Sequence, residues 1–276
     1  MGVPAAPDLP LNPGRPATLL AEPQQTPFDI DFHVAGVPVR ISGLFWLGTG
    51  LIGWGVCQSF ARGDQRELLL YLAIWTAVVL FSILVHELGH ALMYRRFGQD
   101  ARIVLYHFGG LAIPDGWGRR RHLRPAERFV VSAAGPVAQL LLAAAIVVVL
   151  RVGGYLAPFP ISSIGEALGL SEGRPFSSPY AWALVEFLLY VNVCWPLLNL
   201  MPVPPLDGGQ MVREGMETFG VADAARIAAM IGLVVGGGLA YLAFNRGEQY
   251  LGIMFAMLAV ACYQSLQQSP PWRRWN

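Results

Sequence analysis

Residues 68–90 read LLLYLAIWTAVVLFSILVHELGH, an apolar run that closes with two histidines and a glutamate. The part from Leu68 to Val85 is 18 residues long and carries no charged side chain. As a helix it would measure about 27 Å, close to the hydrocarbon thickness of a bilayer. The stretch therefore predicts a transmembrane helix with ionisable side chains near one end.

The composition of the whole chain also indicates a membrane protein. Of its 276 residues, 54% are hydrophobic and 13% are charged, and the mean hydropathy is +0.47. These values lie well outside those of soluble domains. Apolar runs long enough to span a bilayer lie at about 41–60, 68–94, 129–150, 180–201, 224–244 and 249–265. We expect an all-α polytopic membrane protein with about six transmembrane helices.

The remaining segments frame this transmembrane domain, which we place at 41–265. Residues 1–27 contain seven prolines and predict a flexible tail. Residues 28–40 alternate apolar and polar side chains, which predicts a short membrane-associated β-strand segment. Residues 266–276 form a predicted cytoplasmic tail.

All 19 basic residues are arginine, so chemistry that needs a lysine, such as a Schiff base, is excluded. The formal charge of +1 gives no reason to expect a nucleic-acid partner. We make no prediction of the oligomeric state.

The arginines predict an orientation, because cytoplasmic loops are enriched in basic residues. Eight of them lie between the second and third predicted helices: Arg95, Arg96, Arg102, Arg119, Arg120, Arg121, Arg124 and Arg128. If that segment is cytoplasmic, six helices place both termini in the cytoplasm, with 14 arginines inside and 5 outside. We expect a multi-pass protein of a bacterial or archaeal cell membrane.

The sequence His86-Glu87-Leu88-Gly89-His90 is the feature that indicates chemistry. On a helix, His86 and His90 project from one face and can bind the same metal ion. Glu87 is offset by one position and can accept a proton from a water on that ion. The alternative is a pair of buried structural histidines beside an unrelated glutamate. A membrane position disfavours it, since ionisable groups there are costly.

Two histidines need a third protein ligand to form a catalytic metal site. Asp207 is well placed, because it follows the fourth predicted helix in a proline- and glycine-rich turn on the same side of the membrane as the histidines. An aspartate in such a turn can instead act only as a turn former. We favour metal ligation by His86, His90 and Asp207.

The His86–His90 segment in a transmembrane helix and the motif Asn199-x-x-Pro202-x-Pro204-x-Leu206-Asp207-Gly208 together resemble the site-2 protease family of intramembrane zinc metalloproteases. The likeness covers roughly residues 30 to 220. It implies one zinc ion per chain on the two histidines and Asp207, with Glu87 activating water. It also implies a catalytic core made of the second, third and fourth helices.

The resemblance extends to residues around that core. Asn199 matches a family asparagine that holds substrate or stabilises an oxyanion, although a structural hydrogen bond is an equally good interpretation. Residues 36–40 resemble the strand before the first helix, and residues 107–110 resemble a Gly-Gly loop. Small residues in an extended segment could offer a strand edge to an unwound substrate. In the fourth predicted helix, Asn192 lies on the same face as Asn199. Glu186 lies on a different face, and we expect it to pair with another polar side chain in a structural role.

We therefore expect a metalloendopeptidase that cleaves within or near the transmembrane segments of membrane proteins in the lipid bilayer, as in regulated intramembrane proteolysis. Two alternatives remain. An inactive membrane scaffold would not need Glu87 together with all three ligands, and a transporter would be expected to repeat its motif segment in a second half.

Overall fold

The computed structural model describes residues 25–107, 109–114 and 121–268. Within them, six helices are long and apolar enough to cross a membrane. These are α1 (Gly43–Ala61), α2 (Gln65–Arg96), α3 (Pro125–Val152), α5 (Pro179–Asn199), α7 (Ala224–Asn245) and α8 (Gln249–Gln268). Two shorter helices are α4 (Ser162–Ala167) and α6 (Asp207–Thr218). The predicted fold class and helix count are confirmed. Most of the predicted 1–27 tail and residues 269–276 lie outside the described residues.

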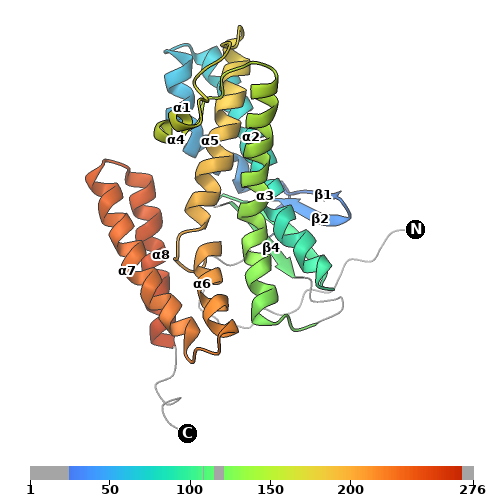
Figure 1. Ribbon diagram of the computed structural model, residues 1–276, viewed down its shortest axis with the longest axis vertical. Coiled ribbons are helices and arrows are strands. Elements are labelled where there is room, and N and C mark those ends of the chain that lie inside the picture. The colour runs from blue at the N-terminus through green and yellow to red at the C-terminus, as the bar shows by residue number, and fades with distance from the viewer. Residues whose placement is uncertain (1–24, 108, 115–120, 269–276) are drawn as a thin grey trace.

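Helix α2 packs against α1, α3 and α5, whereas α7 and α8 pack against each other at one side of the molecule (Figure 1). It runs past the apolar stretch at both ends, from an Asp64 cap whose carboxylate accepts two backbone amides to Arg95 and Arg96 in the last turn. The predicted core of helices two, three and four corresponds to α2, α3 and α5. Gly89 lets α2 pack closely against α3, because a Cβ at this position would lie 2.5 Å from the Ala134 carbonyl oxygen of α3.

A four-stranded sheet lies beside α2 in the order β1-β2-β3-β4. Its strands are β1 (Ile30–Val34), β2 (Val37–Ile41), β3 (Ala101–Tyr106) and β4 (Gly109–Pro114). The outer pairs are antiparallel, whereas β2 and β3 are parallel, with Val39 opposite Ile103. The first two strands occupy the predicted strand segment. The strand order places β1 and β4 at the two edges of the sheet.

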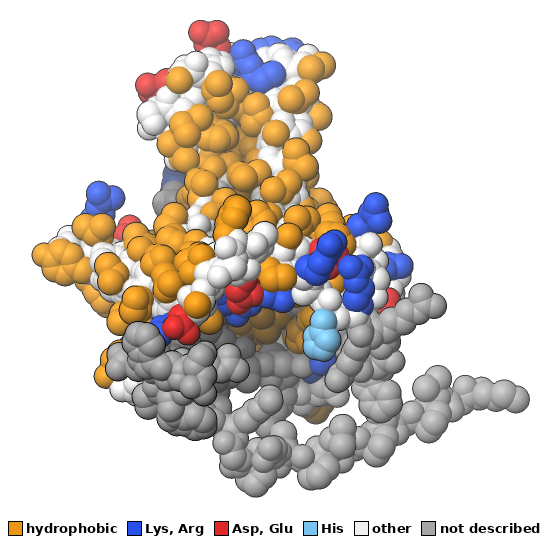
Figure 2. Space-filling model, turned by 60° about the horizontal axis from the view of Figure 1, so that its bottom comes forward, with side chains coloured by type: hydrophobic (Ala, Val, Ile, Leu, Met, Phe, Trp, Pro, Cys, Tyr) orange, Lys and Arg blue, Asp and Glu red, His pale blue; other side chains and the backbone are white. Residues whose placement is uncertain are grey.

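The helix surfaces are largely apolar. Figure 2 shows hydrophobic side chains over the sides of the bundle, with charged side chains gathered towards its two ends. On α3, for example, Leu141 and Val149 are 65% and 70% exposed. Such exposure suits contact with lipid, and the chain is an integral membrane protein.

The segment between α3 and α5 contains the short helix α4. It begins at Ser162, and its cap residue, Ile161, makes no side-chain hydrogen bond to the first turn.

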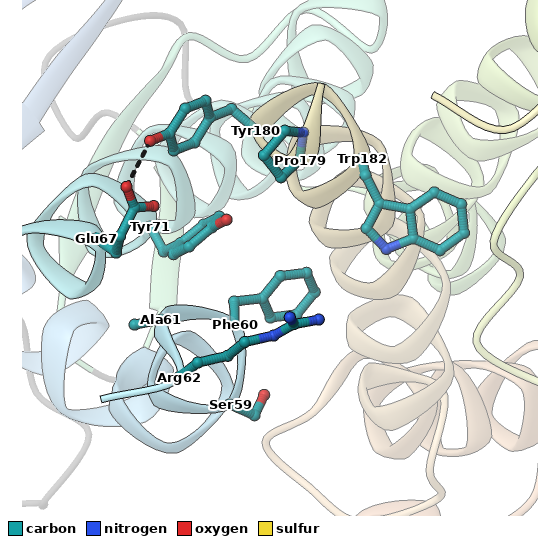
Figure 3. A pocket seen from close by; sticks show the side chains of 9 residues that line it. All are labelled: Ser59, Phe60, Ala61, Arg62, Glu67, Tyr71, Pro179, Tyr180 and Trp182. Atoms are coloured by element: carbon teal, nitrogen blue, oxygen red, sulfur yellow. Dashed lines mark hydrogen bonds between the residues drawn. The ribbon is translucent and has the colours of Figure 1, made fainter. Parts of the chain in front are cut away.

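A cavity of about 610 Å³ lies where α1 ends and α2 and α5 begin (Figure 3). Its lining includes Arg62, Tyr71, Tyr180 and Trp182, and the Tyr180 hydroxyl donates to Glu67 at 2.8 Å. Glu67 precedes His86 by 19 residues on α2, about 28 Å along a helix. This cavity is therefore remote from the histidines.

Candidate metal centre

The structure brings His86, His90 and Asp207 together. Both histidines lie on α2 and are buried, and Asp207 is the first residue of α6. The Nε2 atoms of the two imidazoles are 3.1 Å apart, and the carboxylate oxygens of Asp207 lie 3.0 Å from His86 Nε2 and 3.4 Å from His90 Nε2. One potential ligand atom from each residue thus converges on a common point.

The outer nitrogen of each imidazole is held by a hydrogen-bond acceptor. His90 Nδ1 lies 2.7 Å from the Val131 carbonyl oxygen, so it must carry the proton and donate. His86 Nδ1 lies 2.9 Å from Oε1 of Gln139, whose Nε2 donates to the Ser82 carbonyl oxygen at 3.1 Å. Since only the amide nitrogen can donate to that carbonyl, Gln139 presents its oxygen to His86. In their neutral forms, both imidazoles would therefore present an unprotonated Nε2 to a metal ion at the common point.

These atoms suit a tetrahedral zinc ion. Bonds of about 2.0–2.1 Å at tetrahedral angles separate two ligand atoms by about 3.3 Å. The two Nε2 atoms are 3.1 Å apart, one Asp207 oxygen lies 3.0 Å from His86 Nε2 and the other lies 3.4 Å from His90 Nε2. Metal ligation requires the ionised carboxylate of Asp207 together with neutral imidazoles.

Glu87 is buried beside this group and next to strand β4. A Cβ at Gly110 would lie 2.4 Å from Glu87 Cγ, and the backbone amide of Ala112 donates to the carboxylate. Glycine at position 110 is thus required for the glutamate to occupy its place. The arrangement puts a carboxylate near the three ligands without making it one of them.

Asp207 reaches the site through a compact turn between α5 and α6. The first turn of α6 packs closely against this segment at two glycines: a Cβ at Gly208 would lie 2.1 Å from the Leu200 carbonyl oxygen, and one at Gly209 would lie 2.2 Å from the Pro204 nitrogen. No side chain larger than hydrogen fits at either position.

Two residues of α3 that shape the site were not predicted from the sequence. Gln139 is fully buried in α3 and positions His86, and Gly135 of the same helix faces both imidazoles. A Cβ at Gly135 would lie 2.3 Å from His90 Nε2 and 2.7 Å from His86 Nε2. A glutamine inside an apolar helix, four residues after a glycine, was the available signal.

The Asn199 side chain makes its hydrogen bond within its own helix and not with the three ligands. Its Nδ2 donates to the Trp195 carbonyl oxygen at 3.1 Å, within α5. Asn192 is fully buried and donates to the Ser82 hydroxyl at 2.8 Å, one helical turn before His86. Glu186 accepts a hydrogen bond from the side chain of Trp182, in keeping with the structural pairing expected for it.

A two-histidine, one-aspartate centre with an adjacent glutamate inside a bundle of membrane helices defines a membrane-embedded metallopeptidase. The chain belongs to peptidase family M50, whose family model matches residues 74–239. The predicted family and enzyme class are confirmed, and the three ligands suit the zinc that the names of the relatives carry.

Individual relatives agree with this assignment. The chain is 29% identical over 229 residues to "Putative zinc metalloprotease sll0528" of Synechocystis, covering 79% of this chain and 51% of the relative. It is 29% identical over 170 residues to "Putative zinc metalloprotease Rip3" of Mycobacterium tuberculosis, covering 58% and 37%. The chain thus spans about half or less of the length of these two relatives.

The fold also matches a solved structure, the site-2 protease from Methanocaldococcus jannaschii. The TM-score is 0.51 at 18% sequence identity, over 90% of this chain and 100% of the other. At that identity the likeness is one of fold.

Proposed function

We propose that this chain is a zinc-dependent endopeptidase that hydrolyses peptide bonds within or near the transmembrane segments of membrane proteins. The convergence of His86, His90 and Asp207 at ligand distances, with Glu87 beside them, carries the proposal. A zinc ion on these ligands would polarise a peptide carbonyl and provide a water nucleophile at neutral pH.

Glu87 moves the protons in this scheme. Its carboxylate accepts a proton from the attacking water and returns it to the amine that leaves the scissile bond. Burial against Gly110 and the hydrogen bond from Ala112 hold the carboxylate in one position. The glutamate can therefore act without first being ordered.

Asn199 is proposed to contact the substrate or to donate to the oxyanion that forms on the scissile carbonyl. Its Nδ2 is bonded to the Trp195 carbonyl oxygen, so this role requires the side chain to rotate when substrate binds. Replacement by alanine would then lower cleavage without loss of zinc.

Strand β4 is proposed to hold the substrate. Helical segments hide their peptide bonds, so a protease needs an extended substrate, and an edge strand can pair with one. Among the described strands, β4 pairs only with β3, and its residues Gly110 and Ala112 adjoin Glu87. A substrate strand along β4 would pass the glutamate.

The arginine distribution supports a cytoplasmic position for the α2–α3 connection and both termini. We infer that water reaches the metal centre from that side. Cleavage there would release the cytoplasmic part of a transmembrane protein, as regulated intramembrane proteolysis requires.

The test is a comparison of the full chain with Glu87→Gln in liposomes that contain a single-pass membrane substrate. We expect the variant to keep its zinc and to lose about 10²- to 10⁴-fold in cleavage rate. Full cleavage by Glu87→Gln, or a parent chain without zinc, would rule out the protease. Binding of substrate with no cleavage by either form would favour the scaffold, and substrate translocation would favour the transporter.

A further inference from the structure

A second polar cluster lies on the contact between α3 and α6, outside the metal centre. Its centre is Glu214 of α6, which is 3% exposed. The Ser132 hydroxyl of α3 donates to Glu214 Oε2 at 3.0 Å, and Arg213 Nη2 donates to Oε1 at 3.2 Å. Arg128 Nε lies 3.6 Å from the same Oε1. A buried carboxylate on this contact thus has both oxygens engaged.

The cluster lies on the face of α6 that Asp207 occupies. Glu214 follows Asp207 by seven residues, which is two helical turns and returns to nearly the same face. The side chain that docks α6 onto α3 is therefore in line with the side chain that α6 delivers to the ligand group.

The same part of α3 also holds the histidines. Ser132 is adjacent to Val131, whose carbonyl accepts from His90 Nδ1, and precedes Gly135, which faces both imidazoles. About one turn of α3 thus contacts the two histidines directly. The same turn contacts α6, the helix that carries Asp207, through Glu214.

We propose that Glu214 is a positioning residue for Asp207. By accepting the Ser132 hydroxyl and pairing with Arg128, both on α3, it fixes α6 at the depth and rotation that place the Asp207 carboxylate beside His86 and His90. The role rests on the proposed zinc site and adds to it a residue that touches neither metal nor substrate. Loss of a buried partner leaves the others unpaired, which makes such a contact sensitive to single substitutions.

The test is titration of the metal-free full chain in detergent with Co²⁺, whose visible absorption reports the geometry of its ligands. We expect Glu214→Ala to weaken Co²⁺ affinity about 10- to 100-fold, the range for residues that support metal ligands, and to change the absorption spectrum. Glu214→Gln can still accept from Ser132, so it should recover part of the affinity. Ser132→Ala should give a smaller loss than Glu214→Ala.

Glu127→Gln is the matched control. Glu127 is also a buried carboxylate of this region, but its partners Arg121 and Arg124 lie just before α3 and not on α6. It should lower thermal stability without changing the Co²⁺ spectrum. In a cleavage assay, Glu214→Gln should lower kcat and leave KM unchanged.

The outcomes separate the two proposals. If the folded variants Glu214→Gln and Ser132→Ala bind Co²⁺ as the parent does, with the same spectrum, Glu214 has no positioning role and the zinc site stands. If Glu127→Gln changes the spectrum as much as Glu214→Gln, the effect is general destabilisation and the inference fails. If the parent binds no Co²⁺, the proposed function itself is wrong.

Discussion

His86 and His90 come from one uninterrupted helix, whereas Asp207 reaches the same point on a separate short helix that follows a close-packed turn. The histidine spacing is fixed by the helix itself, since residues four apart lie on one face. The position of Asp207 depends on how α6 packs against α3. Local geometry thus sets two of the ligands and tertiary structure sets the third, and variants can probe each half separately.

We expect the largest effect on zinc affinity from Gly135→Ala, which should displace the two histidines. The added Cβ would lie 2.3 Å from His90 Nε2 and 2.7 Å from His86 Nε2, and it is carried by the backbone of a packed helix. Each ligand contributes about 3 kcal/mol to the free energy of zinc binding, so the displacement of both imidazoles should lower zinc affinity on the order of 10⁴-fold.

Zinc content after dialysis against a weak chelator measures this loss. Gly50→Ala is the control, because a Cβ there meets no atom within 4 Å. A folded Gly135→Ala protein that retains its zinc would show that the imidazoles do not occupy the positions described.

Gly110→Ala separates the proton-transfer residue from both halves of the ligand set. The added Cβ would lie 2.4 Å from Glu87 Cγ and should push the carboxylate out of place. Cleavage should fall by about 10²-fold, as expected for a misplaced catalytic group, while zinc binding remains at the parental level. Loss of zinc and cleavage together would mean that β4 supports the ligands as well as Glu87.

Asp207→Asn removes the charge of the third ligand and leaves the histidine pair on α2 intact. Zinc affinity should fall on the order of 10²-fold, because about 3 kcal/mol from one ligand is lost. Competition with a chromophoric chelator measures the affinity. An Asp207→Asn protein that binds zinc as weakly as Gly135→Ala would show that the histidine pair cannot bind the ion without α6.

Gln139→Ala gives the smallest of these effects and again probes the histidine half. Without the amide oxygen, His86 Nδ1 loses its acceptor and the imidazole is free to change tautomer. Zinc affinity should fall about 10- to 100-fold. Asn192→Ala, which removes a hydrogen bond to Ser82 one step further out, should have less effect. Equal losses for the two variants would contradict a direct role of Gln139.

The predictable parts of the molecule are those set by nearby residues. Hydropathy indicated six membrane helices, and the spacing of His86, Glu87 and His90 on one of them indicated the metal-binding face. Asp207 was recognised through its proline- and glycine-rich turn. Strands β3 and β4 were not predicted as part of a sheet, because the parallel pairing of Val39 with Ile103 joins segments more than 60 residues apart.

The supporting contacts were not predictable for the same reason. Gln139 lies 53 residues from His86, and Ser132 lies 82 residues from Glu214. The sequence around Gln139 or Ser132 does not indicate which residue of another helix it will contact after the helices pack. Short sequence motifs identify the residues that carry the chemistry, whereas tertiary contacts between helices determine where those residues lie.

X-ray absorption at the zinc edge on the purified Glu87→Gln chain tests the ligand set of the metal centre most directly. We predict one zinc per chain with two imidazole nitrogens and oxygen ligands, all at about 2.0–2.2 Å. A chain without stoichiometric zinc, or a sulfur ligand at about 2.3 Å from one of Cys57, Cys194 and Cys262, would contradict the assignment of His86, His90 and Asp207.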